Sequence, residues 1–327
     1  MCVCVCSRVA PPRYRMLSSP PASAQEVQSD VPRTIGLDVA RTCAEVPYFA
    51  RGDGAAVLAR VLLAFARFVP GTSYVQGMSN LAAFVLLAFR GGGGDWASPT
   101  SADLEADAFW TLTAVVQNRL SGYFDKGMGA LLGDTAVLAA LVERHSAPAA
   151  VRTLKAVEFE WLFVTPDWFV HLFFDGVPPR VALHVWDLIL WHGHNAGHTS
   201  LVLFWVVLGI VERCSGVLSG CGGFQEVIDA LRCAALEVAH VDDLRAVSSV
   251  SVRDLEDEVP TIRAGLDPSV SDPTGARKKK QAASAAAAIG GGGGGGKRQP
   301  PSRSSSFGEG SSKGWFGWAR GSKDPAS

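Results

Sequence analysis

Hydrophobic side chains recur at helical spacing through most of the chain between residues 31 and 246. The clearest segment covers residues 55–69, where Val57 and Val61 begin an apolar stripe and Arg60 lies on the other side. Apolar residues three or four positions apart share one face of a helix, so an amphipathic helix is predicted here. We find no convincing strand-like alternation of apolar and polar residues anywhere in the sequence. The pattern therefore predicts an all-α fold.

The same periodicity predicts further helices, and turn residues mark where several of them begin. Thr165 before Pro166 predicts a helix start, with a hydroxyl N-cap and proline at the first helical position. Ser101 or Asp103 is the predicted cap of an earlier helix. Asp187 is expected to be a buried, hydrogen-bonded residue. The remaining expected helices cover residues 75–89, 101–120, 131–145, 199–213 and 224–238, with others opening at 166 and 179.

Both ends of the chain differ from this central region. Residues 1–30 are rich in proline, serine and alanine without apolar periodicity, and we expect a disordered lead-in. Residues 31–246 are expected to form one helical domain, and 247–266 a short helical or irregular extension. Residues 267–327, which contain a poly-glycine run, are expected to be a disordered low-complexity tail. Aromatic residues at 315–318 in this tail leave open a contact with a membrane interface or a partner.

Composition and charge narrow the possible functions. Hydrophobic residues make up 48% of the chain and charged residues 19%, and the formal net charge is −1. No global field attracts nucleic acid or a membrane, so no nucleic-acid partner is expected. Seven cysteines without an export signal favour a reducing compartment. The best apolar run, residues 201–211, is shorter than the about 20 residues that cross a bilayer, so no transmembrane segment is expected.

Several familiar catalytic patterns are absent or incomplete. Lys297 follows the poly-glycine run, but Arg298 stands where a phosphate-binding loop needs serine or threonine to reach Mg²⁺. Residues 192–198 contain three histidines, for which a polar loop is favoured over a metal site because no fourth ligand has recognisable spacing. No nucleophile elbow is present. The chain is not expected to hold a metal or a nucleotide of its own.

Two short strings remain, and each contains a polar residue able to act on a phosphoryl-transfer transition state. The first reads Ile-x-x-Asp-x-x-Arg from Ile35 to Arg41, and the second reads Tyr-x-Gln-Gly from Tyr74 to Gly77. In this order and in a helical setting they resemble the two signatures of the TBC domain of Rab GTPase-activating proteins. The resemblance continues through residues 108–110, 167–173 and 185–193. A multi-helix TBC-type domain is therefore expected over residues 31–246.

The resemblance implies a role for each matched residue. Arg41 would be an arginine finger and Gln76 a glutamine finger, both inserted in trans into the nucleotide site of a GTP-bound Rab-family GTPase. Asp38, read as a helix N-cap or loop anchor, would hold the finger loop. Tyr74 would contribute packing and Gly77 close backbone approach at the turn that presents the glutamine.

The resemblance also implies the wider function. The protein would accelerate GTP hydrolysis by a Rab in vesicle trafficking, without a cofactor of its own, because GTP and Mg²⁺ belong to the partner. The implied location is cytoplasmic, with peripheral contact to endomembranes left open.

One departure from the family favours an alternative. TBC domains usually have a helical segment with an arginine and a tryptophan before the first signature, and nothing from Met1 to Val31 matches it. We therefore expect either a truncated sequence or a fold that lacks its first helices. A TBC-fold scaffold that binds Rab without stimulating hydrolysis is the alternative function, and an unrelated helical adaptor is a third.

Overall fold

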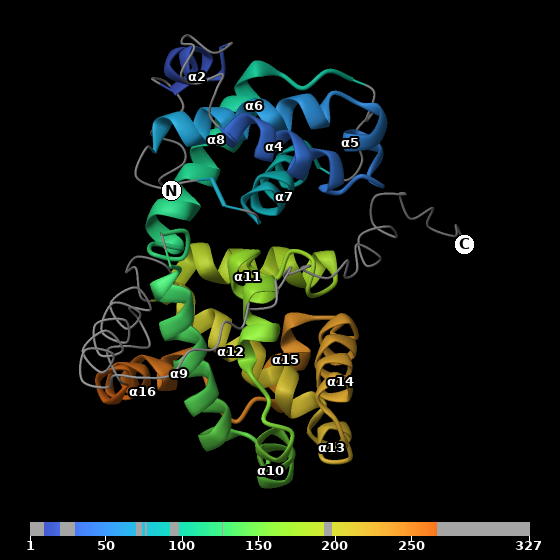
Figure 1. Ribbon diagram of the computed structural model, residues 1–327, viewed down its shortest axis with the longest axis vertical. Coiled ribbons are helices and arrows are strands. Elements are labelled where there is room, and N and C mark those ends of the chain that lie inside the picture. Colours follow the sequence, from blue (N-terminus) through green and yellow to red (C-terminus); the bar gives the residue numbers. More distant parts are fainter. Residues whose placement is uncertain are drawn as a thin grey trace, which may run out of the picture.

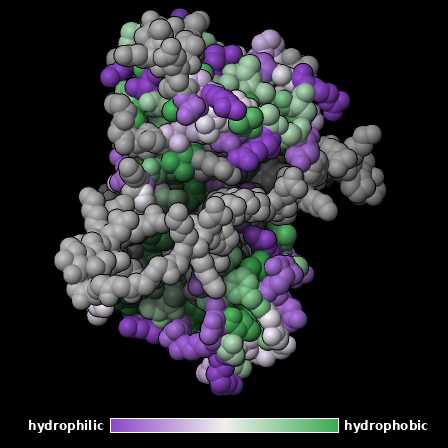
Figure 2. All heavy atoms as spheres, viewed as in Figure 1, coloured by the Kyte–Doolittle hydropathy of each residue, from purple (hydrophilic) through white to green (hydrophobic). Residues whose placement is uncertain are grey.

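The computed structural model describes residues 10–19, 30–69, 74–75, 77–91, 98–125, 127–192 and 198–266. Within these ranges every regular element is helical and no strand occurs, so the predicted all-α fold is confirmed. Figure 1 shows two groups of helices stacked along the longest axis, with α2 to α8 in one half and α9 to α16 in the other. On the face shown in Figure 2, hydrophilic and hydrophobic residues are intermixed, and hydrophobic residues are seen where the two halves meet.

The first half is built around α6, which covers Gly54–Phe68. Its apolar stripe is fully buried from Val57 to Phe65, as the sequence pattern predicts, and Phe68 at its end is partly buried. Helices α2, α4, α5, α7 and α8 all contact α6. The bounds of the other elements are α2 Ala10–Ser18, α4 Asp30–Arg41, α5 Pro47–Arg51, α7 Met78–Arg90, α8 Ala102–Ala114 and the π-helical turn η1 Val115–Arg119.

The second half is built around α12, which covers His198–Arg213. Its apolar run is buried on nearly all sides because α9, α11, α14, α15 and α16 surround it. The bounds of the other elements are α9 Gly129–His145, α10 Pro148–Ala156, η2 Trp161–Phe163, η3 Pro166–Val170, α11 Pro179–His192, α13 Ser215–Leu218, α14 Phe224–Leu236, α15 Val241–Val247 and α16 Val252–Gly265.

Helix α7 joins the two halves through aromatic packing. The ring of Phe84 lies 5.2 Å from the ring of Phe174 and 4.5 Å from that of Trp186, measured between centroids. Trp186 also donates a hydrogen bond from Nε1 to the carbonyl oxygen of Leu172 at 3.1 Å. These contacts hold the middle of α7 against the second half of the molecule.

The structure corrects the expectation of a disordered lead-in for residues 10–18, which form α2. Tyr14 is 2% exposed, packs against Phe109 and donates a hydrogen bond to the carboxylate of Glu105. The same carboxylate accepts two hydrogen bonds from Arg60, each at 2.7 Å. A single buried tyrosine therefore anchors a helix whose own sequence is too polar to show a hydrophobic stripe.

The two helix caps predicted at Thr165 and Ser101 differ in outcome. Thr165 does not cap a helix, because its backbone is already helical and its Oγ1 bonds to Oγ1 of Thr135 at 2.9 Å. The segment that follows is the π-helical turn η3. Ser101 does cap α8, because its side chain accepts a hydrogen bond from the amide of Leu104. The extension expected over residues 247–266 contains helix α16.

Candidate functional site

Arg41 is the last residue of α4, and its side chain is 58% exposed. The helix buries Ile35 and Val39 on its inner face, so Arg41 projects from the side left to solvent. Its Nη2 atom lies 2.5 Å from Oδ1 of Asp38, one helical turn earlier. The guanidinium is thus accessible while one of its N–H groups is held by the protein.

Asp38 is 3% exposed and connects the two predicted signatures. Its Oδ1 accepts from Arg41, and its Oδ2 accepts a hydrogen bond from the hydroxyl of Tyr74 at 2.7 Å. Burial and the neighbouring Asp38 carboxylate raise the pKa of Tyr74 well above its usual value, so the phenol stays a donor. The prediction that Asp38 is a helix N-cap is wrong, because it lies inside α4, whereas its expected role of holding the arginine agrees with the contact to the guanidinium. Tyr74 contributes this hydrogen bond as well as packing.

A second contact joins α4 to α7. The hydroxyl oxygens of Thr42 and Ser79 are hydrogen-bonded at 2.9 Å, and both side chains are buried. Thr42 also donates to the carbonyl oxygen of Asp38 at 2.7 Å. Sequence reasoning assigned no role to either hydroxyl, since a threonine beside an arginine and a serine in a helix are common. The end of α4 is therefore fixed to the first turn of α7 by side chains as well as by Tyr74.

Gly77 is the N-cap residue directly before α7, and its φ of +105° lies in the left-handed region that favours glycine. A Cβ atom at this position would lie 2.9 Å from Nε2 of His171 and 3.1 Å from Cγ1 of Val170. The close approach of the backbone that was expected at Gly77 is therefore an approach to His171 and Val170. Gln76 lies outside the described residues, between Val75 and Gly77.

His171 was missed in the sequence, although it contacts the start of α7. Its Nδ1 lies 3.1 Å from Oδ1 of Asp175, and its Nε2 lies 3.4 Å from Nδ2 of Asn80. Burial disfavours the charged ring, but Asp175 and then Asp167 outweigh it, so the pKa of His171 is raised from 6.5. The only hint in the sequence is an aspartate four residues after the histidine, which is too common to be informative.

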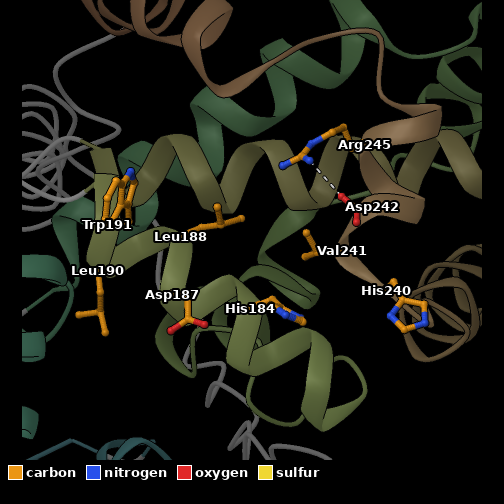
Figure 3. Close-up of a pocket in the computed structure, with 9 residues that line it drawn as sticks. All are labelled: His184, Asp187, Leu188, Leu190, Trp191, His240, Val241, Asp242 and Arg245. Atoms are coloured by element: carbon orange, nitrogen blue, oxygen red, sulfur yellow. Dashed lines mark hydrogen bonds and ion pairs between the residues drawn. The ribbon is translucent and has the colours of Figure 1, made fainter.

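A separate pocket of about 620 Å³ opens between α11 and α15 and contains none of the predicted site residues. Figure 3 shows Leu188 of α11 pointing toward Val241 at the start of α15, while the Asp187 carboxylate points away from Val241 and Trp191 lies further along α11. Asp187 is exposed at this pocket, so its predicted burial is wrong. The sequence placed it beside Trp186 in a helix, and the turn of the helix carries the two side chains in different directions.

Two general observations concern the part of the chain that the structure describes. No group of three or more histidine, cysteine, aspartate or glutamate side chains in these ranges could hold a metal ion. Most of the histidine-containing segment 192–198 lies outside them. No helix within these ranges combines the length and hydrophobicity needed to cross a bilayer.

Comparison with known proteins gives one family match. Residues 9–218 match the family described as the Rab-GTPase-TBC domain. Mouse Carabin is 28% identical over 231 residues, covering 70% of this chain and 47% of Carabin. Human TBC1 domain family member 10B is 29% identical over 182 residues, covering 55% of this chain and 20% of that protein. The chain thus spans about half or less of these two relatives.

Solved structures give the same fold. The Chlamydomonas flagellar RabGAP TBC domain has a TM-score of 0.56 at 23% identity, covering 72% of this chain and 71% of that chain. The Ypt/Rab-GAP domain of Gyp1p has a TM-score of 0.64 at 19% identity, covering 78% of this chain and 81% of that chain. The family match begins at residue 9 and so includes α2, earlier than the start at residue 31 that the sequence signatures suggested.

Proposed function

The chain belongs to the Rab-GTPase-TBC domain family, and from this premise we propose that it is a GTPase-activating protein for a Rab-type small GTPase. Arg41 and Gln76 are the two residues that it supplies in trans to the partner's GTP. The observation that carries this proposal is the accessible guanidinium of Arg41. It contacts the buried carboxylate of Asp38, which Tyr74 in turn hydrogen-bonds. The same tyrosine begins the signature that contains Gln76.

Arg41 has the chemistry that the transition state of GTP hydrolysis requires. Negative charge spreads over the oxygens of the transferring phosphoryl group, and a planar guanidinium with five N–H donors can bind several of them. The Nη2 group of Arg41 contacts Asp38 at 2.5 Å, so most N–H groups of the guanidinium remain available to a partner. Because Tyr74 fixes Asp38 in turn, the guanidinium is held in place before the GTPase arrives. Such preorganisation reduces the entropy lost on reaching the transition state.

Gln76 would act on the attacking water. A carboxamide has one acceptor oxygen and an NH₂ group with two donors, so it can accept a hydrogen bond from the water while donating one elsewhere. Its neighbour Gly77 has the left-handed backbone that starts α7, and Tyr74 is tied to Asp38. The nucleotide and Mg²⁺ are supplied by the partner GTPase in this mechanism, and this chain turns over no substrate of its own.

Leu37 adds a candidate contact for the GTPase. It is 64% exposed and lies four residues before Arg41 on α4, which places both side chains on one face of the helix. An exposed leucine beside a catalytic arginine suits the desolvated contact that a docked GTPase would make. A role in vesicle trafficking, at the cytoplasmic surface of endomembranes, follows from this class of partner and belongs to the proposal.

A single-turnover screen tests the proposal. A panel of GTP-loaded Rabs is mixed with the wild-type chain, with Arg41→Ala and with Gln76→Ala, and phosphate release is followed. The arginine that a GAP supplies to Ras is worth about 10³–10⁵ in rate, so each variant should lose orders of magnitude of stimulation. Stimulation that survives both substitutions would refute the mechanism. A chain that binds GTP-loaded Rab but never accelerates hydrolysis would instead be the scaffold considered above.

A further inference from the structure

The side chain of His171 lies against the first turn of α7, directly after the position of Gln76. We propose that His171 is a positioning residue for the Gln76 segment, that its neutral form is the productive one, and that stimulation of the GTPase therefore falls in acid. This inference rests on the proposed function for its effect on catalysis. Its structural part, the coupling between His171 and Gly77, can be measured in the chain alone.

The contacts of His171 select one tautomer. Nδ1 faces the carboxylate oxygen of Asp175 at 3.1 Å, where only a donor is useful, so Nδ1 carries the proton. Nε2 faces the side-chain nitrogen of Asn80 at 3.4 Å, and this nitrogen is a donor. A weak hydrogen bond from Asn80 therefore requires Nε2 to be an acceptor. The arrangement corresponds to a neutral ring with its free lone pair directed at α7.

Protonation would disturb this contact. With a proton on Nε2, two donors would face each other, and Asn80 would have to turn its carboxamide to present the oxygen, or the ring would have to withdraw. Either movement changes the contact between the ring and the first turn of α7, which Gly77 directly precedes. The side chain of His171 is only 14% exposed, so water cannot easily take over the new donor. The contact between His171 and the first turn of α7 therefore depends on the protonation state of the ring.

Several charged groups around the ring affect the pKa of His171. Asp175 lies on one side, and Asp167 adds a second negative charge, partly compensated by Arg232 of α14 at 3.1 Å. From α7 the ring meets Asn80, and the thiol of Cys43, after α4, faces Asp175 and has a raised pKa because of burial. The two aspartates outweigh burial, so the pKa of His171 is raised from 6.5.

The first experiment follows the chain without a GTPase. The amide resonance of Gly77 and the side-chain amide of Asn80 are recorded by NMR between about pH 6 and pH 8, together with the ring of His171. All three should shift with one shared midpoint. Replacing Asp175 by asparagine removes the main cause of the raised pKa and should move that midpoint to lower pH. A Gly77 resonance that ignores the titration of His171 would overturn the inference.

The second experiment measures stimulation of a responsive Rab over the same pH range, after subtracting hydrolysis by the Rab alone. Because the pKa of His171 is raised from 6.5, the ring is mostly protonated at pH 6, so stimulation should be lower at pH 6 than at pH 8. His171→Gln should remove this step, and Asp175→Asn should shift it toward acid. The matched control His184→Gln changes an exposed histidine of α11 and should keep the wild-type profile.

The outcomes separate the two proposals. If no Rab is stimulated at any pH while Gly77 still titrates with His171, the proposed function fails and the coupling stands. If wild-type stimulation is strong but its pH profile is unchanged in His171→Gln, the inference about His171 is wrong and the proposed function stands. If His171→Gln does not fold, the shift in Asp175→Asn decides the question.

Discussion

The sharpest test of the site is removal of one oxygen atom, by the substitution Tyr74→Phe. The hydroxyl of Tyr74 donates to the buried carboxylate of Asp38 at 2.7 Å, and the same carboxylate holds Arg41 at 2.5 Å. The substitution leaves the aromatic ring and the Asp38–Arg41 contact in place. It removes the hydrogen bond by which Tyr74 fixes the Asp38 carboxylate.

The chain offers a matched control, because a tyrosine–carboxylate–arginine arrangement recurs at Asp134. Its carboxylate accepts from the hydroxyl of Tyr123 at 2.5 Å and from Arg263 at 2.5 Å, and also from Ser200. This arrangement ties α9 to α16, in the other half of the molecule. Tyr123→Phe therefore removes the same atom from the same kind of contact without touching the residues proposed to reach GTP.

The expected magnitudes follow from these contacts. A hydrogen bond to a buried charged group contributes about 1.5–3 kcal/mol, so both substitutions should lower the free energy of unfolding by that order. Only Tyr74→Phe should change catalysis. Since Arg41 keeps its own contact with Asp38, part of the restraint remains, and we expect about a tenfold fall in stimulated hydrolysis, equivalent to about 1.4 kcal/mol.

The assay combines urea unfolding with single-turnover GTP hydrolysis at saturating concentration of the chain and at a temperature where both variants are folded. Equal destabilisation with a catalytic defect in Tyr74→Phe alone would support the reasoning. If Tyr74→Phe stimulates the GTPase within about twofold of wild type despite a normal loss of stability, the Asp38 restraint has no role in catalysis. If both variants lose stimulation equally, the defect comes from folding.

Three further predictions use other contacts. Gly77→Ala must adopt a left-handed backbone and meets His171, so it should lose about 1–2 kcal/mol or more of unfolding free energy, whereas Gly216→Ala, with open space around it, should not. Leu37→Asp should raise the concentration of chain needed for half-maximal stimulation without changing thermal stability, while Val217→Asp, equally 64% exposed on α13, should not. Because the folded pKa of His171 is raised, its protonation stabilises the fold below the unfolded pKa of about 6.5, and this contribution is lost as pH rises through the folded value. The stability difference between wild type and His171→Gln, measured by urea unfolding, should therefore be larger near pH 6 than near pH 8.

The sequence was sufficient wherever local pattern decides structure. The apolar stripe of α6 and the buried run of α12 are visible as periodicity, and the structure places both in the core. The two signatures also led to the correct family. These features depend on neighbouring residues along the chain, which is the information that a single sequence contains.

The remaining features depend on partners far away in sequence. Helix α2 forms because Tyr14 reaches Glu105, 91 residues later, and nothing in its own composition indicates this. Asp38 reads as a cap because aspartate is unfavourable inside helices, yet here Tyr74 and Arg41 satisfy its carboxylate. The contact of His171 with α7 likewise requires the three-dimensional arrangement of the two halves.

The dual attachment of α7 has a consequence for how the protein responds to heat. Its first turn is bound to α4 through Thr42 and Ser79, while Phe84 and Asn80 bind it to the opposite half. A small shift between the halves would change the position of the groups proposed to act on GTP while leaving every helix intact. On gradual warming, stimulation of the GTPase should consequently disappear before the circular dichroism signal of the helices does.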